Sequence, residues 1–236
     1  RFIACPTYYS FDPALERVFG AMPENYLTDF GRLLDHLERT GLDDTTIVVF
    51  AGDHGEEFLD HDGWGHGATL YEEQLHVPLV VRLPDRRGAG RVVRGPVQQV
   101  DLLPTLLDAL GHVVPTEIQG ESRFAAMTTA SERAAESTTP QSFAELHLDG
   151  EDADALFDGR FKLIADGSGE HIELFDLSVD PAEQHDLARE RPVLAGFLRA
   201  QLLARREASA ARTVGRQAAD LDPEARSRLE ALGYLN

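Results

Sequence analysis

The sequence contains a single cysteine, Cys5, among its 236 residues. One cysteine excludes a disulfide within the chain and any metal cluster built from cysteines. It leaves the compartment open between cytoplasm, periplasm and secretion, because a secreted protein need not contain disulfides. The chain also lacks an apolar run of the length that spans a bilayer, so we expect a soluble protein without a transmembrane segment.

Basic residues are scarce as well. The chain has 22 Lys and Arg against 41 Asp and Glu, which gives a net charge of −19. This balance argues against nucleic acid as a partner, because nucleic-acid-binding surfaces are normally basic. Hydrophobic residues at 42% and charged residues at 27% are ordinary for a globular protein. The length is sufficient for one large domain, or for one and a half.

The first half of the chain reads as an α/β fold. An amphipathic stripe from Asp29 predicts a helix that ends at Gly41. The uncharged runs "TTIVVF" (45–50) and "VPLVVRL" (77–83) predict strands buried in a mainly parallel sheet. Asp101 is expected to cap a further helix, which ends at Gly111.

The second half has a different pattern. Residues 142–148, 155–166 and 171–177 predict three short antiparallel strands, followed by a helix over 192–207 and a final short helix from Asp222 to Gly233. We therefore divide the chain into an α/β core (1–120), a connecting segment (121–141) and a C-terminal subdomain (142–236).

Candidate metal ligands follow the first predicted strand in "FAGDHGEEFLDHDGWGHG" (50–67). Ligands of open α/β sheets bind beyond the carboxyl ends of the strands, which is where Asp53 and His54 lie. A carboxylate beside an imidazole suits Zn²⁺, Mn²⁺ or a similar ion. The alternative is that Asp53 only caps a helix and that His54 is only a turn residue.

Two further histidines, His61 and His66, follow in the same glycine-rich stretch. A histidine beside a metal-bound anionic ester can donate to the ester oxygens or protonate the leaving group. Nearby acids can orient such imidazoles, although we expect most of these acids to form a solvated loop. These acids are Glu56, Glu57, Asp60 and Asp62.

These motifs carry a family resemblance. The segment "TTIVVFAGDHGEEFLDHDGWGHGATLYEEQLHVPLVVRLP" resembles the metal-binding strand and loop of the sulfatase family, in the alkaline-phosphatase-like superfamily. Further along the chain, "QVDLLPTLLDALG" resembles the helix after that loop, and "GRFKLI…ELFDLSVDPAEQHDLA" the family's C-terminal subdomain. The resemblance covers roughly residues 24–236 and implies part of an alkaline-phosphatase-like sandwich with a small antiparallel subdomain.

The resemblance also implies roles for individual residues. Asp53 and His54 correspond to the second pair of ligands of one divalent ion, which is Ca²⁺, Mn²⁺, Zn²⁺ or Mg²⁺. His66 corresponds to a basic residue that binds the sulfate or phosphate oxygens and is the catalytic candidate, with His61 as a second candidate for that substrate pocket. Many arylsulfatases have Asn where this chain has His54, and this difference leans toward the phosphoester and phosphonate hydrolases and phosphoethanolamine-type transferases.

The family's nucleophile is a cysteine in a C-x-P/A-S-R motif, or a Ser or Thr, far upstream. The sequence around Cys5, "CPTYYS", does not fit this motif. We therefore expect the chain to be the C-terminal half of an enzyme that hydrolyses small-molecule or glycan sulfate esters, with the N-terminal half as its partner and little activity alone. The alternatives are phosphoester or phosphonate chemistry, and a non-catalytic remnant or subunit.

Overall fold

A computed structural model describes residues 24–84, 86–93, 95–129, 141–148 and 151–212. Cys5 and the helix predicted from Asp222 to Gly233 lie outside these ranges. The described elements up to Leu202 belong to one compact unit. No described helix is both long and apolar enough to cross a membrane.

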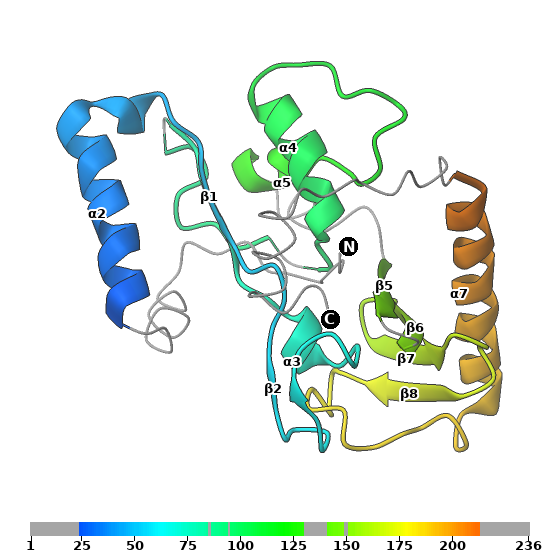
Figure 1. Ribbon diagram of the computed structural model, residues 1–236. Helices are drawn as coiled ribbons and strands as arrows, with labels where there is room; N and C mark the ends of the chain where they lie inside the picture. The colour runs from blue at the N-terminus through cyan, green and yellow to red at the C-terminus, as the bar shows by residue number, and fades with distance from the viewer. Residues whose placement is uncertain (1–23, 85, 94, 130–140, 149–150, 213–236) are drawn as a thin grey trace, which may run out of the picture. The chain divides into compact units, whose positions relative to one another are not determined.

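The first described element is helix α2 (Glu24–Thr40), which contains the predicted amphipathic stripe (Figure 1). It ends where the sequence predicts, because Gly41 adopts φ 70°, a left-handed conformation that glycine tolerates without steric cost. A short 3-10 helix, η1 (Leu42–Asp44), leads from this point toward the first strand.

Strands β1 (Val48–Ala51) and β4 (Leu79–Arg82) pair in one sheet, as predicted, but they run antiparallel. This pair therefore differs from the mainly parallel arrangement that the sequence predicts for the sheet as a whole. Parallel neighbours need a crossover connection, usually a long helix, whereas the connection here returns through a hairpin and a one-turn helix. No parallel pair occurs in the described parts of the chain, and β1 is only partly buried. The mainly parallel sheet remains a prediction.

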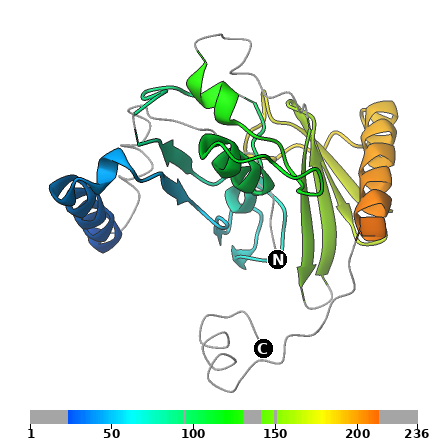
Figure 2. The same cartoon turned by 90° about the horizontal axis from the view of Figure 1, so that it is seen from above.

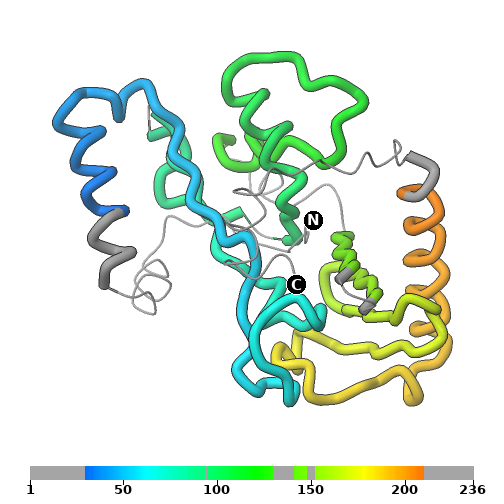
Figure 3. Tube along the Cα trace, viewed as in Figure 1, coloured from blue at the N-terminus to red at the C-terminus, as the bar shows by residue number. Residues whose placement is uncertain are grey.

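The connection consists of the hairpin β2 (Glu57–Phe58) and β3 (Trp64–Gly65), followed by α3 (Glu72–Leu75). Figure 3 traces this path from β1 to α3. The connection contains all of the candidate site residues.

Residues of β1 and β4 pack in a hydrophobic cluster together with residues of α4 (Leu102–Ala109) and α5 (Phe124–Thr128). Helix α5 falls in the predicted connecting segment and contributes Ala126 and Met127 to this core. Asp101, in the 3-10 helix η2 (Gln99–Asp101), makes no side-chain cap for α4. Its buried carboxylate instead accepts from the backbone N–H of Gln98 at 3.0 Å, in a capping box at the start of η2, which continues directly into α4. The predicted capping role is therefore confirmed for η2 and not for α4. The same carboxylate also accepts from the Nε of Arg123 at 2.9 Å.

The C-terminal subdomain contains four antiparallel strands in the order β5-β6-β7-β8, one more than predicted. They are β5 (Ser142–Leu148), β6 (Glu151–Phe157), β7 (Phe161–Asp166) and β8 (Ile172–Asp176). A turn at Asp158–Arg160 divides the run predicted as one strand, because Gly159 adopts φ 98° there. The additional strand begins with the alternating acids of β6. Because Asp and Glu are depleted in strands, the sequence did not predict a strand there.

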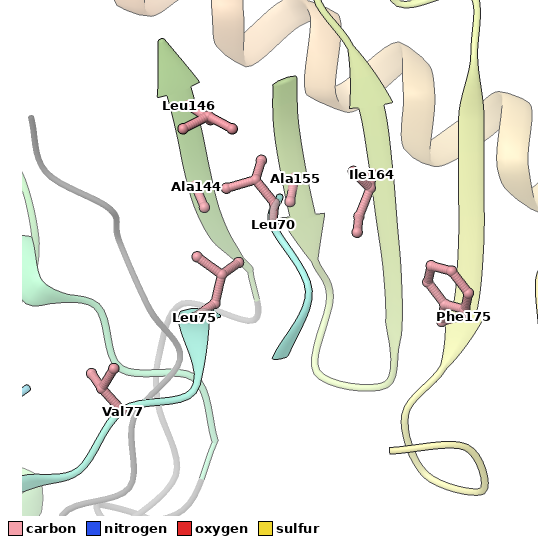
Figure 4. Close-up of a cluster of buried hydrophobic side chains, with 8 residues drawn as sticks. All are labelled: Leu70, Leu75, Val77, Ala144, Leu146, Ala155, Ile164 and Phe175. Carbon is pink, nitrogen blue, oxygen red and sulfur yellow. The ribbon is translucent and has the colours of Figure 1, made fainter. Parts of the chain in front are cut away.

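Both faces of this sheet are covered. Leu156, Leu163 and Leu174 pack against the first part of helix α7 (Pro192–Arg212), as predicted for the helix over 192–207 (Figure 2). The opposite face packs against residues of the β1–β4 connection. Figure 4 shows that cluster, which consists of Leu70, Leu75, Val77, Ala144, Leu146, Ala155, Ile164 and Phe175. The connection that carries the candidate site therefore shares a core with the C-terminal sheet.

Candidate functional site

The loop after β1 is held against helix α3 by backbone hydrogen bonds. The N–H of Gly55 donates to the carbonyl of Gln74 at 2.8 Å, and the N–H of Glu56 donates to the carbonyl of Glu73 at 3.0 Å. A Cβ at position 55 would lie 1.8 Å from the Glu73 carbonyl oxygen. The close approach of the two backbones therefore requires glycine at this position.

A side chain from outside the connection supports the same loop. The Nε2 of Gln99 donates to the carbonyls of Gly52 and Asp53, at 3.0 and 2.8 Å. A Cβ at Gly52 would lie 2.9 Å from the Cβ of Val77, so the loop also packs tightly on the segment that joins α3 to β4. These contacts determine the positions of Asp53 and His54 before any ligand binds.

The side chains of Asp53 and His54 present two metal-binding groups. The Nδ1 of His54 lies 2.7 Å from the carbonyl of Gly55. A carbonyl only accepts, so Nδ1 carries the proton and Nε2 keeps a free lone pair. That Nε2 lies 3.9 Å from Oδ2 of Asp53, whose side chain is 79% exposed. No helix begins directly after Asp53, because the next element is strand β2. This rules out the alternative that Asp53 is a helix cap.

The donor chemistry of this pair suits a divalent ion, because a carboxylate oxygen and an oriented imidazole nitrogen point to the same space. Among the described residues, no group of three or more His, Cys, Asp and Glu side chains is placed to hold an ion. Asp53 and His54 are therefore two candidate ligands, fewer than a complete metal site has.

His66 lies beside this pair. Its ring stacks on the ring of His54, with centroids 4.0 Å apart and an interplanar angle of 29°. Its Nδ1 lies 3.1 Å and 3.3 Å from the two carboxylate oxygens of Glu56, which orients the ring and leaves Nε2 for another partner. The structure therefore brings together Asp53, His54 and His66, as the sequence predicted.

His61 is not part of this cluster. Its Nδ1 lies 2.7 Å from Oε1 of Glu73 and its Nε2 lies 3.1 Å from the carbonyl of Glu183. Its ring stacks on Tyr71 with centroids 3.7 Å apart. Because both ring nitrogens already have acceptors, this geometry supports a structural role, and substrate binding by His61 stays a prediction.

Two opposing effects act on the imidazole of His61. Burial of the ring lowers its pKa, but the hydrogen bonds to Glu73 and to the Glu183 carbonyl, with the charges of both carboxylates, outweigh burial. The net result is a pKa raised above the ordinary value of 6.5. The protonated ring donates to both acceptors at once.

Of the four acids of the loop, Asp60 and Asp62 are exposed, as expected, whereas Glu57 is not. Glu57 is 1% exposed, and its carboxylate accepts from the N–H of Gly63 at 2.7 Å and from the Nε2 of Gln74 at 3.3 Å. It therefore closes the β2–β3 hairpin instead of facing solvent. Glu73 was not singled out from the sequence, where only its place in "YEEQ" next to the histidine-rich segment could have drawn attention to it.

Comparisons with known proteins give the family. A family model described as sulfatase matches residues 29–112. Arylsulfatase K of Xenopus laevis is 32% identical over 170 residues, which cover 69% of this chain and 31% of that protein. The chain thus spans about a third of the length of this curated relative.

Solved structures of related hydrolases also align with this chain. The structure of BT4656 in complex with its substrate, D-glucosamine-2-N,6-O-disulfate, aligns with a TM-score of 0.63 and 26% identity, covering 77% of this chain and 37% of that one. The phosphonate monoester hydrolase SpPMH from Silicibacter pomeroyi aligns with a TM-score of 0.66 and 30% identity, covering 76% and 38%. These similarities are consistent with the alkaline-phosphatase-like superfamily. Within it, residues 29–112 place this chain in the sulfatase family.

Proposed function

We propose that this chain forms part of the active centre of a divalent-metal-dependent hydrolase that cleaves sulfate esters of sugars. The observation that carries the proposal is the grouping of Asp53, His54 and His66 within the sulfatase-family segment. The similarity to a structure solved with a disulfated glucosamine supports a sulfated sugar as the substrate class.

The Asp53 carboxylate and the His54 Nε2 would hold the metal ion. When bound, such an ion acts as a Lewis acid and stabilises negative charge on the nucleophile and the transferring group. Asp53 supplies a negative charge that favours cation binding, and His54 supplies a neutral nitrogen whose orientation is set by the Gly55 carbonyl. The remaining ligands and the nucleophile would come from outside the described residues.

His66 would act on the ester itself. Its Nε2 lies free of the hydrogen bonds in which the ring takes part, all of which use Nδ1. In its protonated form, the ring would donate from Nε2 to the leaving oxygen as the nucleophile bonds to sulfur and the S–O bond to the sugar breaks, so that the sugar departs as an alcohol and the sulfuryl group passes to the nucleophile. The Glu56 carboxylate holds the ring and stabilises its positive charge during this step.

A second function is supported by a specific observation. The structure of a phosphonate monoester hydrolase aligns at 30% identity. The family resemblance also implies that His54 stands where many arylsulfatases have Asn. Phosphoester or phosphonate hydrolysis by the same residues is therefore the alternative. Both reactions transfer a tetrahedral anionic group, so the chemistry of Asp53, His54 and His66 serves either.

Kinetics of the protein as its gene encodes it will test the proposal. We expect kcat/KM for 4-nitrophenyl sulfate to exceed that for 4-nitrophenyl phosphate and for a phenyl phosphonate ester, and to depend on added Mn²⁺, Ca²⁺ or Zn²⁺. A preference for the phosphorus esters would support the alternative. Metal-independent turnover that survives Asp53→Ala would overturn both.

A further inference from the structure

Three charged side chains meet in the interior beside helix α3. Lys162 of β7 is 1% exposed, and its Nζ lies 2.9 Å from Oε1 of Glu72 and 2.9 Å from Oε1 of Glu183. The side chain of Glu183 has no solvent exposure. Burying charges costs free energy even when they are paired, so hydrophobic burial alone does not account for this group.

Glu183 makes two further contacts with the connection that carries the site. Its Oε2 accepts a hydrogen bond from the backbone N–H of Glu72 at 2.6 Å, at the first residue of α3. Its carbonyl accepts from the Nε2 of His61 at 3.1 Å. The residue has φ 53°, a left-handed conformation that is uncommon outside glycine. This conformation directs both the side chain and the carbonyl of Glu183 toward the connection.

Helix α3 in turn holds the site loop. The carbonyls of Glu73 and Gln74, which follow Glu72 directly, accept from the N–H groups of Glu56 and Gly55. Gly55 supplies the carbonyl that orients His54, and Glu56 supplies the carboxylate that orients His66. A continuous series of polar contacts therefore joins the C-terminal sheet to both histidines of the site.

Apolar packing acts between the same two parts but with less directional control. Leu70 and Leu75 pack on the face of the sheet formed by residues such as Ile164 and Phe175 (Figure 4). Hydrophobic contact is non-directional and tolerates sliding. The ion pairs at Lys162 have defined distances and therefore determine where α3 lies along that face.

We propose that Glu183 and Lys162 are positioning residues for the site formed by Asp53, His54 and His66, and that they act through helix α3. The proposal deepens the function proposed above and takes its catalytic meaning from it. The contacts that support it are independent of that function. In this proposal, the C-terminal subdomain sets the geometry of the metal and ester site but contributes no ligand to it.

Hydrogen exchange on the full chain tests this directly, by comparing wild type with Glu183→Gln. We expect the amides of Gly55 and Glu56 to lose protection by about tenfold or more, because their acceptors on α3 become mobile. The amides of Leu156 and Leu163, which pair between the two central strands β6 and β7, should keep their protection. The matched control is Asp176→Asn, which neutralises a buried carboxylate of the same subdomain that pairs with Arg160 and not with α3. The control should leave Gly55 and Glu56 unchanged.

A second variant guards against misfolding from an unpaired buried lysine. The double variant Lys162→Met with Glu183→Gln removes both buried charges and leaves Glu72, which is 16% exposed, able to reach water. It should reproduce the loss of protection at Gly55 and Glu56. Unchanged protection at these two amides in both variants would overturn the proposal. So would a simultaneous loss at Leu156 and Leu163 in both, because the network would then serve general stability only.

A second readout connects the network to the site. Titration of wild type with Mn²⁺ should give measurable binding, which Glu183→Gln weakens about 10- to 100-fold while Asp176→Asn does not. Wild-type protein that binds no metal would contradict the proposed function, whereas the exchange experiment would still decide the positioning role. Metal binding that is equal in wild type and Glu183→Gln would count against positioning and leave the proposed function standing.

Discussion

The rings of His54 and His66 lie face to face, although a hairpin separates them in the chain. Each ring uses Nδ1 for a bond within the loop: His54 to the Gly55 carbonyl and His66 to the Glu56 carboxylate. Each ring therefore presents Nε2 outward. Both rings thus use their nitrogens in the same way, but their neighbours differ. The Asp53 carboxylate lies beside the Nε2 of His54. This asymmetry underlies the assignment of one histidine to the metal and the other to the ester.

The first prediction concerns Asp53. We expect Asp53→Ala to abolish measurable metal binding and turnover, because one remaining donor cannot retain a divalent ion against water. Isothermal titration with Mn²⁺ and Zn²⁺ measures the first effect. Asp44→Ala, which changes the net charge equally at an exposed position outside the loop, is the control and should bind as wild type does. Full metal binding by Asp53→Ala would show that the ligand assignment is wrong.

The second prediction separates His66 from the metal. His66→Ala should keep the metal and slow turnover by about 10²–10⁴-fold, the usual effect of losing an acid–base group. Glu56→Gln should slow it by about 10- to 100-fold, because the ring keeps its place but loses its charged partner. The exposed His112→Ala is the control. Loss of metal binding in His66→Ala would instead make His66 a ligand.

The third prediction concerns the close backbone contact at Gly55. Gly55→Ala should destabilise the protein by about 1–3 kcal/mol, because its Cβ would clash with the Glu73 carbonyl. Gly31→Ala in α2 is the matched control: nothing lies within 4 Å of its Cβ, and we expect a gain of about 0.5–1 kcal/mol. Urea unfolding measures both. Equal effects would mean that the loop shifts freely and that its bonds to α3 are weak.

The fourth prediction concerns pH. The pKa of His61 is raised above 6.5, so the folded state binds its proton more tightly than the unfolded state. The stability gained from His61 should be complete below pH 6.5 and decline as the pH rises through the raised pKa of the folded protein. The stability difference between wild type and His61→Gln should therefore shrink with increasing pH. A difference that grows with pH would contradict the protonated state.

The fifth prediction concerns the buried pair in the first half of the chain. Arg123 and Asp101 have side chains 3% and 1% exposed, with Nη2 of the arginine 2.8 Å from Oδ2. Arg123→Ala should cost about 3–5 kcal/mol, because it leaves a buried carboxylate without its cation. In the pair of Arg86 and Asp43, whose arginine side chain is 67% exposed, Arg86→Ala should cost at most about 1 kcal/mol. Thermal or urea unfolding compares them, and a small effect of Arg123→Ala would mean that water reaches Asp101.

Local sequence patterns were sufficient for much of this protein. The end of α2 at Gly41, the strands near 48–51 and 79–82, and the helix against the C-terminal sheet follow from periodicity and from glycine and proline positions. The grouping of Asp53, His54 and His66 was also predictable, because one short glycine-rich segment contains all three. Neighbours in sequence have few ways to be far apart in space.

Tertiary structure alone decided the rest. The direction of β4 depends on how the chain returns through α3, and the hydrophobic run over 77–83 is compatible with either direction. The acceptors of His61 include the carbonyl of Glu183, and Lys162 pairs with both Glu72 and Glu183. These contacts join segments about a hundred residues apart, and a lysine or glutamate that pairs in the interior has the same local pattern as one that faces water. Composition and periodicity record which residues prefer burial, but only the folded chain determines which charges meet there.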